Sequence, residues 1–433
     1  MPRVSRRAVA PSRPCRGSLR LSVFDLVPRH VALSYVYYFD GRLDPDDLCH
    51  SLGELLSGFP FLAGRLVRTA AGEHDVRYDG GAVSFVVEDD DRPMPRRASS
   101  DGTKQPFGAT RNSIPFWRVA LAGQPLFRAR LSRYADGSAL AVSISHALVD
   151  MHSFCALMDD WAGAHRGATR TPPGERGLPW PANSREHSAL REHFLHFNRI
   201  DALRTTARFA RGGLDCETRT VHFTQSELAG MRGEAQRTLE TGEWISTNDA
   251  LAAHLWSELG ALRRFDRGTA SVLTSIVNLR QCGSRALAKT YFGNATLAIP
   301  ATLAEDGSAG LSRRAAAVRG SIRRLDDERI GGVIAYLESR ARKDDLRGVW
   351  PRMDVFESDL WINNWSKFGI YEVDFGAGKP SWFDMPNVPI PWFSLVLPAP
   401  PAIGGVDVHL SLPRAAACEL GTGQAMRRLH AFA

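Results

Sequence analysis

The chain has 433 residues, of which 44% are hydrophobic and 23% are charged, and this balance is typical of a globular protein. Its net charge of +7 comes almost wholly from arginine that is dispersed along the chain, which argues against the basic stripe of a nucleic-acid-binding protein but suits a polyanionic small ligand. No apolar run approaches the roughly 18 residues that a membrane span requires.

The N-terminus is basic, because six arginines precede the first acidic residue, Asp25. An arginine-rich, acid-poor start resembles an organelle transit peptide, but a strand-like segment follows almost at once. We therefore expect a disordered tail over residues 1–18 and a cytoplasmic protein, with an organelle as the alternative. The length predicts two or three domains.

Residues 19–170 have the pattern of an α/β domain. Val31 to Phe39 is rich in Val and Tyr and predicts a strand, and the acidic residues 44–47 predict the start of a helix. Strands are also expected over 83–88 and 126–132, with a charged loop over 88–113 between them.

The most informative stretch is His146-Ala147-Leu148-Val149-Asp150. The alternating residues before it predict a half-buried strand, and those after it have helical spacing. A histidine at such a junction can face a cleft while its neighbours hold it rigidly, as a general base requires. However, about one His-x-x-x-Asp is expected by chance in a chain of this composition, so the motif needs support from elsewhere.

The second half of the chain repeats this organisation. Residues 171–215 are expected to form a linker or crossover because the chain is rich in Pro, Gly and Arg over about 166–190. Residues 216–433 then alternate expected strands and helices as a second α/β domain. We predict two α/β halves with the active site between them.

Several stretches together resemble the plant and fungal acyl-CoA-dependent acyltransferases of the BAHD family. The pentapeptide at 146–150 resembles the family's H-x-x-x-D motif, and the heptapeptide at 374–380 resembles its second signature, D-F-G-W-G-K-P. Supporting matches occur in the family's order from residue 62 to residue 407. They are Leu62-Ala63-Gly64-Arg65-Leu66, Val277-Asn278-Leu279-Arg280, Tyr291-Phe292-Gly293-Asn294, Asn364-Trp365, Tyr371-Glu372 and Gly404-Gly405-Val406-Asp407.

The resemblance implies two chloramphenicol-acetyltransferase-like domains, each a mixed β-sheet flanked by helices. It also implies a monomer with no permanently bound cofactor and no metal, which uses acyl-CoA as co-substrate and a small-molecule alcohol or amine as acceptor. The acyl group would pass directly to the acceptor, without a covalent acyl-enzyme. Neither the acyl chain nor the acceptor is readable from the sequence.

The resemblance also assigns roles to single residues. His146 would be the general base, and the indole N–H of Trp365, with Asn363 beside it, would stabilise the oxyanion. Asp150 would pair with Arg280 and support the wall of the site instead of relaying a proton. Asp374, Gly376 and Gly378 of the second signature would also be structural support.

Two positions depart from the family pattern. Met151 stands where the family usually has Gly, and Ala377 stands where the second signature has Trp. We expect Met151 to reshape the loop behind His146 and Ala377 to alter packing near the coenzyme channel.

Simpler interpretations remain open for each residue. His146 would otherwise be a core histidine at a strand end, Asp150 the N-cap of the following helix, and Trp365 a core side chain. His254 and Glu258 lack a third ligand and indicate a helix face, not a metal site. Six scattered cysteines without a Cys-x-x-Cys pair suggest neither zinc nor a disulfide framework.

Two alternative functions also stay open. A related enzyme can take its acyl group from a carrier-protein thioester, although such domains normally carry two adjacent histidines and Ser145 precedes His146 here. The other alternative is a non-catalytic relative that binds a ligand, for which the departures at 151 and 377 are the only support.

Overall fold

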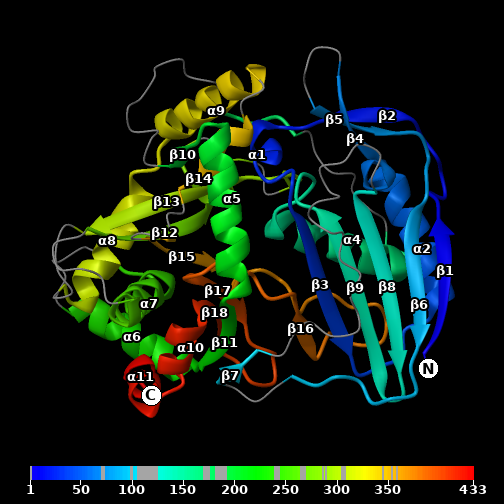
Figure 1. Cartoon of the computed structure of the whole chain (residues 1–433). Helices are drawn as coiled ribbons and strands as arrows, with labels where there is room; N and C mark the ends of the chain where they lie inside the picture. The colour runs from blue at the N-terminus through cyan, green and yellow to red at the C-terminus, as the bar shows by residue number, and fades with distance from the viewer. Residues whose placement is uncertain are drawn as a thin grey trace.

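The computed structural model describes residues 2–69, 74–97, 101–104, 125–168, 176–180, 193–237, 244–263, 270–284, 287, 290–303, 309–343, 346–352, 355–356 and 359–433. The chain forms two mixed β-sheets side by side, each flanked by helices (Figure 1). The α/β fold expected from the sequence, with one mixed sheet in each half, is therefore confirmed.

The sheet of the N-terminal half has six described strands, and all its strand pairs are antiparallel except β6–β8. In spatial order the strands are β1 (Arg3–Val9), β6 (Val83–Asp89), β8 (Phe127–Tyr134), β9 (Gly137–Ser145), β3 (Ala32–Phe39) and β16 (Trp382–Asp384).

The sheet of the C-terminal half has seven described strands, of which β15 runs parallel to both of its neighbours. In spatial order they are β13 (Thr296–Leu303), β12 (Ser271–Asn278), β15 (Asp359–Asn364), β17 (Phe393–Pro398), β18 (Val406–Pro413), β11 (Cys216–Phe223) and β7 (Gly102–Thr103).

Helices pack against both sheets, and short strands form two smaller sheets. The helices are α1 (Val23–Leu26), α2 (Pro45–Gly58), α4 (Met151–His165), α5 (Arg199–Leu214), α6 (Gln225–Arg237), α7 (Thr247–Arg263), α8 (Leu311–Arg323), α9 (Asp327–Arg342), α10 (Arg414–Leu420) and α11 (Gly423–Leu429), with 3₁₀ turns η1 (Pro60–Ala63), η3 (Leu279–Gln281) and η4 (Leu346–Gly348). The small sheets are β2 (Gly17–Arg20), β5 (His74–Tyr78) and β4 (Arg65–Arg68), and β10 (Phe194–His196) with β14 (Val349–Pro351).

Strand β9 was expected to be half-buried, but all nine of its residues are buried. Its larger residues, such as Leu140 and Val142, face the main core. Its small residues Ala139 and Ala141 face a second, smaller core that is closed by Trp382. The alternation of large and small side chains thus reflects two covered faces of different depth, not one buried and one wet face.

The two halves exchange short strands. The last strand of the N-terminal sheet, β16, comes from the C-terminal part of the sequence and pairs with β3. In return β7, which lies in the loop expected over 88–113, pairs with β11 at the edge of the C-terminal sheet. The main hydrophobic core contains residues of both halves, such as Leu140 and Leu395.

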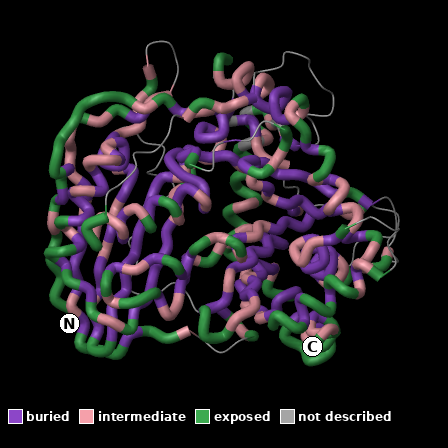
Figure 2. Tube along the Cα trace, turned by 180° about the vertical axis from the view of Figure 1, so that it is seen from behind, coloured by how far each residue is buried: buried purple, intermediate pink, exposed green. Residues whose placement is uncertain are grey.

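The prediction of a disordered tail over residues 1–18 is wrong. Arg3–Val9 pairs along its whole length with β6, and Gly17–Arg20 pairs with β5. The outer edge of β6 has backbone groups that need partners, and the first strand supplies them while Arg3 and Arg6 are exposed and Arg7 pairs with Asp46. Figure 2 shows this strand as a mostly exposed edge beside strands that are largely buried.

The segment expected to be a linker, 171–215, contains regular structure where it is described, namely β10 and α5. Residues 171–175 and 181–192 of that segment lie outside the described residues. None of the helices in the described part of the chain is long and apolar enough to cross a bilayer.

Candidate active site

His146 follows the last residue of β9, and four residues separate it from the start of the helix α4. Its backbone N–H donates to the carbonyl oxygen of Val31 at 2.8 Å, which ties the turn to the segment before β3. The next residues, Ala147, Leu148 and Val149, are fully buried in the main core. The sequence therefore holds the histidine rigidly between a strand and a helix, with its side chain only half-buried.

Burial lowers the pKa of His146 below its usual value. The Asp150 carboxylate, the backbone of Val149 and the side chain of Asn294 act in the opposite direction but do not outweigh the burial. The imidazole is therefore neutral near pH 7, as a proton acceptor must be. Its Nδ1 atom is enclosed and has no hydrogen-bond partner among the described residues.

Asp150 makes no hydrogen bond to His146 and has two structural roles. It is the N-cap of α4, because its Oδ1 accepts the backbone N–H of Ser153 at 2.9 Å. It also pairs with Arg280, whose Nη1 donates to Oδ2 at 2.7 Å and whose Nη2 donates to Oδ1 at 3.2 Å. The backbone N–H of Ala295 donates to the same carboxylate at 3.0 Å. The N-cap and the arginine pair thus exist together.

Arg280 reaches this carboxylate from the C-terminal half. It lies in η3, after β12, and its guanidinium also donates to the carbonyl oxygen of Gly293 at 2.9 Å and to Ser153 Oγ at 3.0 Å. The side chains of Arg280 and Asp150 are only 2% and 3% exposed, so each charge depends on the other for stabilisation. The ion pair therefore joins α4 to the C-terminal sheet next to the histidine turn.

Asn294 is a site residue to which the sequence analysis gave no role of its own. Its Nδ2 donates to the carbonyl oxygen of His146 at 2.8 Å and to Asp25 Oδ1 at 2.9 Å. Its Oδ1 is enclosed and has no partner in the described part of the chain. The one available signal was its position at the end of the Tyr-Phe-Gly-Asn block.

Asp25 extends this network behind the histidine turn. It is completely buried and accepts a hydrogen bond from the Asn294 backbone N–H at 2.9 Å. Arg176 forms an ion pair with Asp25 at 3.3 Å and donates to the carbonyl oxygen of Leu148 at 2.8 Å. The backbone of the 146–150 turn is thus held by the side chains of Asn294 and Arg176, and Asp25 binds both of them.

Trp365 and Asn363 come from the end of β15, on the C-terminal sheet. The Trp365 ring packs edge-on against Tyr35 of β3, with 5.9 Å between ring centroids, and its backbone N–H donates to Val396 at 2.7 Å. Its indole N–H has no acceptor among the described residues, and the ring is 8% exposed, so it also packs in the core. Asn363 is half-buried, and the neighbouring Asn364 donates to Asn248 at 2.6 Å.

The second signature lies at the other end of α4 from Asp150, a helix of 15 residues or roughly 20 Å. Arg166, just after α4, donates to the Asp374 carbonyl oxygen, and the Phe375 ring packs edge-on against Trp161. Gly376 and Gly378 have positive φ angles of 83° and 87°, which other residues rarely adopt. This segment is not part of the histidine network.

Met151 and Ala377, the two departures from the family pattern, each pack against neighbouring parts of the chain. Met151 is the first residue of α4 and is 5% exposed in the main core. Ala377 packs against the turn at Gly41, where an added Cβ would lie 2.8 Å from the Ala377 methyl group.

The pair of His254 and Glu258 is used structurally, because His254 Nε2 donates to the Leu429 carbonyl oxygen at 2.8 Å and Glu258 accepts from Arg428 at 3.0 Å. Among the described residues, no group of three or more His, Cys, Asp or Glu side chains is arranged to hold a metal ion.

Comparison with known proteins finds a family and individual relatives that match nearly the whole chain. Residues 3–420 match the model of the family described as "Transferase family". Tryptamine hydroxycinnamoyltransferase 2 of Oryza sativa subsp. japonica is 26% identical over 91% of this chain and 90% of its own. Shikimate O-hydroxycinnamoyltransferase of Nicotiana tabacum is 23% identical over 87% and 85%.

Solved structures share the fold at lower identity. TRI101 of F. graminearum, complexed with ethyl coenzyme A, superimposes with a TM-score of 0.75 at 17% identity and covers 95% of this chain and 99% of its own. Vinorine synthase gives a TM-score of 0.69 at 16% identity, with 96% of each chain covered.

Proposed function

Because this chain belongs to the Transferase family, the BAHD acyltransferases, we propose that it moves an acyl group from an acyl-CoA thioester directly to a hydroxyl or amine of a small-molecule acceptor. The single observation that carries the proposal is the half-buried His146, which burial keeps neutral on a turn held from both halves of the chain.

In this proposal His146 removes the proton of the acceptor as its oxygen or nitrogen attacks the thioester carbonyl. The thioester is already activated, so no covalent acyl-enzyme is required. When the tetrahedral intermediate collapses, the imidazolium returns the proton to the departing CoA thiolate. Proton transfer of this kind contributes about 10²–10⁴-fold to rate.

The groups behind the turn would keep the imidazole in place. The enclosed Nδ1 atom of His146 and the enclosed Oδ1 atom of Asn294 both lack a hydrogen-bond partner among the described residues, and the Asn294 side chain raises the pKa of His146. We infer that Nδ1–H points toward this oxygen, which leaves Nε2 as the proton acceptor. Asp150 and Arg280 would hold the wall of the site.

The oxyanion that develops on the thioester carbonyl needs a hydrogen-bond donor aimed at it. We assign this role to the indole N–H of Trp365, with Asn363 beside it. An indole N–H donates but does not accept, so it favours the charged oxygen.

The names of the relatives support either class of acceptor. Tryptamine hydroxycinnamoyltransferase is named for an amine, and shikimate O-hydroxycinnamoyltransferase is named for transfer to oxygen. We therefore propose an amine or an alcohol as acceptor, with acyl-CoA as the only other substrate.

The experiment that tests the proposal follows release of free thiol from a panel of acyl-CoAs with mixed amines and alcohols. Wild type is expected to turn over, and His146→Ala is expected to lose about 10²–10⁴-fold in kcat. His152→Ala is the matched control, because His152 lies in the first turn of α4 and contacts Phe368.

Equal turnover by the wild type and His146→Ala would contradict the mechanism. Turnover only with a carrier-protein thioester would show that this thioester, and not acyl-CoA, is the acyl donor. No release from either kind of thioester would favour a non-catalytic relative.

A further inference from the structure

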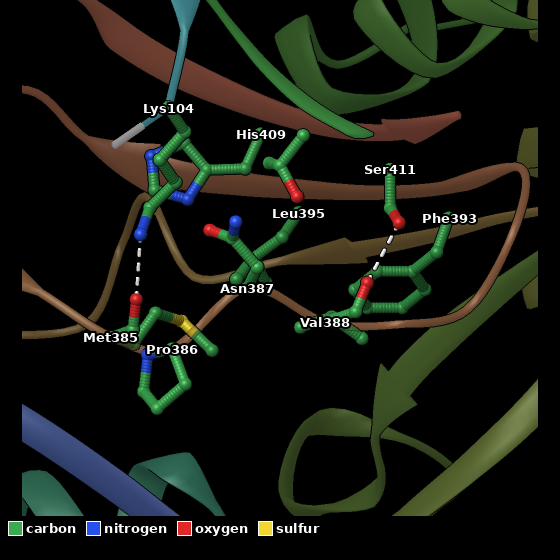
Figure 3. Close-up of a pocket in the computed structure, with 10 residues that line it drawn as sticks. Lys104, Met385, Pro386, Asn387, Val388, Phe393, Leu395, His409 and Ser411 are labelled. Atoms are coloured by element: carbon green, nitrogen blue, oxygen red, sulfur yellow. Dashed lines mark hydrogen bonds between the residues drawn. The ribbon is translucent and has the colours of Figure 1, made fainter. Parts of the chain in front are cut away.

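A small cavity lies on the face of the C-terminal sheet that looks toward the N-terminal half. Its walls come from β17, β18, the loop that follows β16 and the end of the segment with β7. They include Lys104, Asn387, Leu395, His409 and Ser411. Figure 3 shows the Asn387 amide in the middle of this group, between His409 and Ser411. Asn387 is exposed, so the cavity opens to solvent on one side.

The strand register connects this cavity to the proposed oxyanion site. Asn363 on β15 is directly opposite Leu395 on β17, and Leu395 is directly opposite His409 on β18. Residues opposite each other in neighbouring strands point to the same face of a sheet. His409 therefore lies two strands from Asn363 on the same wall, which is about 10 Å at the usual strand spacing.

His409 is held neutral. Burial lowers its pKa to about 3, and the positive charges of Lys104 and Arg97 act in the same direction. Lys104 is 9% exposed and pairs with Asp384 at 2.7 Å, and Arg97 pairs with Asp407 at 2.6 Å. The ring nitrogens of His409 make no hydrogen bond to any described residue, so they are available to a ligand.

We propose that this cavity receives the far end of the acyl acceptor and selects a neutral hydrogen-bonding group of the size of a hydroxyl over an ammonium. The inference rests on the proposed function, and it adds His409 as a residue that determines which acceptor is used. The cavity is small and takes one terminal group, while the nucleophilic end of the acceptor reaches His146.

The chemistry of the lining supports this choice. A neutral imidazole and a carboxamide each donate and accept hydrogen bonds, so His409 and Asn387 together satisfy a hydroxyl. The burial and the two positive charges that disfavour an imidazolium at this position disfavour a ligand ammonium for the same physical reason. A diamine would have to place its second charge there.

Two matched pairs of acceptors test the proposal by thiol release from the best acyl-CoA. The first pair is 4-aminobutan-1-ol and butane-1,4-diamine, and the second is 4-(2-aminoethyl)phenol and 4-(aminomethyl)phenethylamine. In each pair the wild type is expected to have at least a tenfold higher kcat/KM for the hydroxyl compound. The difference is expected in KM, because binding and not proton removal is affected.

Variants separate this cavity from the rest of the site. His409→Gln keeps a neutral hydrogen-bonding group and is expected to keep the preference. His409→Leu is expected to lose it, and His409→Glu is expected to move it toward the diamines by about tenfold or more, because a carboxylate attracts the second ammonium. His50→Gln, at an exposed position of α2, is the control.

An unchanged preference in His409→Glu, or equal use of both members of each pair by the wild type, would overturn the inference. So would failure of all four compounds while other amines or alcohols release thiol, and that result would leave the proposed function intact. Failure of every acceptor tried would count against the proposed function itself.

Discussion

At the scale of single residues, the balance of forces at His146 decides at which pH the proposed base works. A histidine on a strand-to-helix turn is not by itself a base, because an exposed imidazole is partly protonated near pH 6.5. Burial shifts the pKa downward here, and the nearby Asp150 carboxylate and Asn294 side chain only partly offset this shift. The residue is thus kept in the form that accepts a proton.

This balance predicts the pH dependence of the reaction. A lowered pKa means that His146 stays neutral as the pH falls through 6.5 and becomes protonated only below that value. With an alcohol acceptor, which does not itself titrate in this range, we expect log(kcat/KM) to be level from about pH 8 to about 6.5 and to fall only at lower pH, with a slope of one. A pH–rate profile at a saturating concentration of acyl-CoA measures this fall in kcat/KM at low pH. A midpoint above 6.5 would show that the imidazolium is favoured instead.

Arg280 shows how a buried charge depends on its partner. Its guanidinium is 2% exposed and is neutralised by Asp150, so either partner alone is an uncompensated buried charge. We predict that Asp150→Ala lowers the free energy of unfolding by about 3–5 kcal/mol, measured by urea denaturation at pH 7. The double variant Asp150→Ala/Arg280→Met is expected to recover part of this loss, because it leaves no unpaired charge. Equal or greater instability of the double variant would show that the pair acts mainly through other contacts.

At the scale of elements, the segment 101–104 is attached to the C-terminal half by a cluster of acidic and histidine side chains. His430, just after α11, has Nδ1 2.6 Å from Glu227 Oε1 and Nε2 3.4 Å from Asp101 Oδ2. Asp101 also accepts the backbone N–H of His222 at 2.8 Å, next to the pairing of β7 with β11. These contacts hold the short strand that reaches across from the N-terminal half.

The cluster predicts a pH-dependent contribution to stability. The carboxylates of Asp101 and Glu227 raise the pKa of His430 to about 9, above its value of roughly 6.5 in the unfolded chain. This stabilisation is therefore complete below about pH 6.5 and is lost as the pH rises through 9. We expect His430→Gln to lower the free energy of unfolding by about 1–2 kcal/mol at pH 6, a modest value because Asp101 is partly exposed to solvent. At pH 10 the loss is expected to be much smaller, because His430 is then neutral in the wild type.

Urea denaturation of the wild type and His430→Gln at both pH values measures this difference. His50→Gln serves as the control, at an exposed position of α2. A loss of stability that is the same at pH 6 and pH 10 would mean that His430 contributes through packing against Phe223 instead of through charge.

The helix α4 illustrates which elements were predictable. Its start was foreseen because Asp150 is a good N-cap and the helical spacing follows at once, and both features are local. The strand β1 was missed because the basic composition of residues 3–9 indicates a tail, and only the free edge of β6 makes it a strand. The short strands β7 and β16 have too few residues for any periodicity to appear.

At the scale of the whole molecule, the exchange of β16 and β7 interlocks the two halves. Without β16 the edge of β3 would lack a partner and the core of Val36 and Tyr38 would lose Trp382, which stacks on Tyr38 with 4.4 Å between centroids. The main core likewise runs through both halves. The division into domains at 19–170 and 216–433 stays a proposal. Because the two ranges exchange strands, we do not expect either of them to fold independently.

We therefore predict that the full chain unfolds in one cooperative thermal transition, because neither half can bury its core alone. Residues 1–170 and 171–433, expressed separately, are each expected to show no cooperative transition in far-UV circular dichroism. Co-expression of the two pieces is expected to restore one. A cooperative transition of residues 1–170 alone would show that the N-terminal sheet is independent of β16.

The sequence by itself determined the features that depend on neighbouring residues or on the order of motifs: the period of the strands and helices, the strand–His146–helix junction, and the series of signatures from 62 to 407 that identifies the family. Only the tertiary structure decided which groups meet at that junction. Asn294 reaches the backbone of His146 from 148 positions away, and Arg280 reaches Asp150 from 130 positions away. Contacts at such separations depend on how two sheets pack against each other, and no local pattern in the chain records that packing.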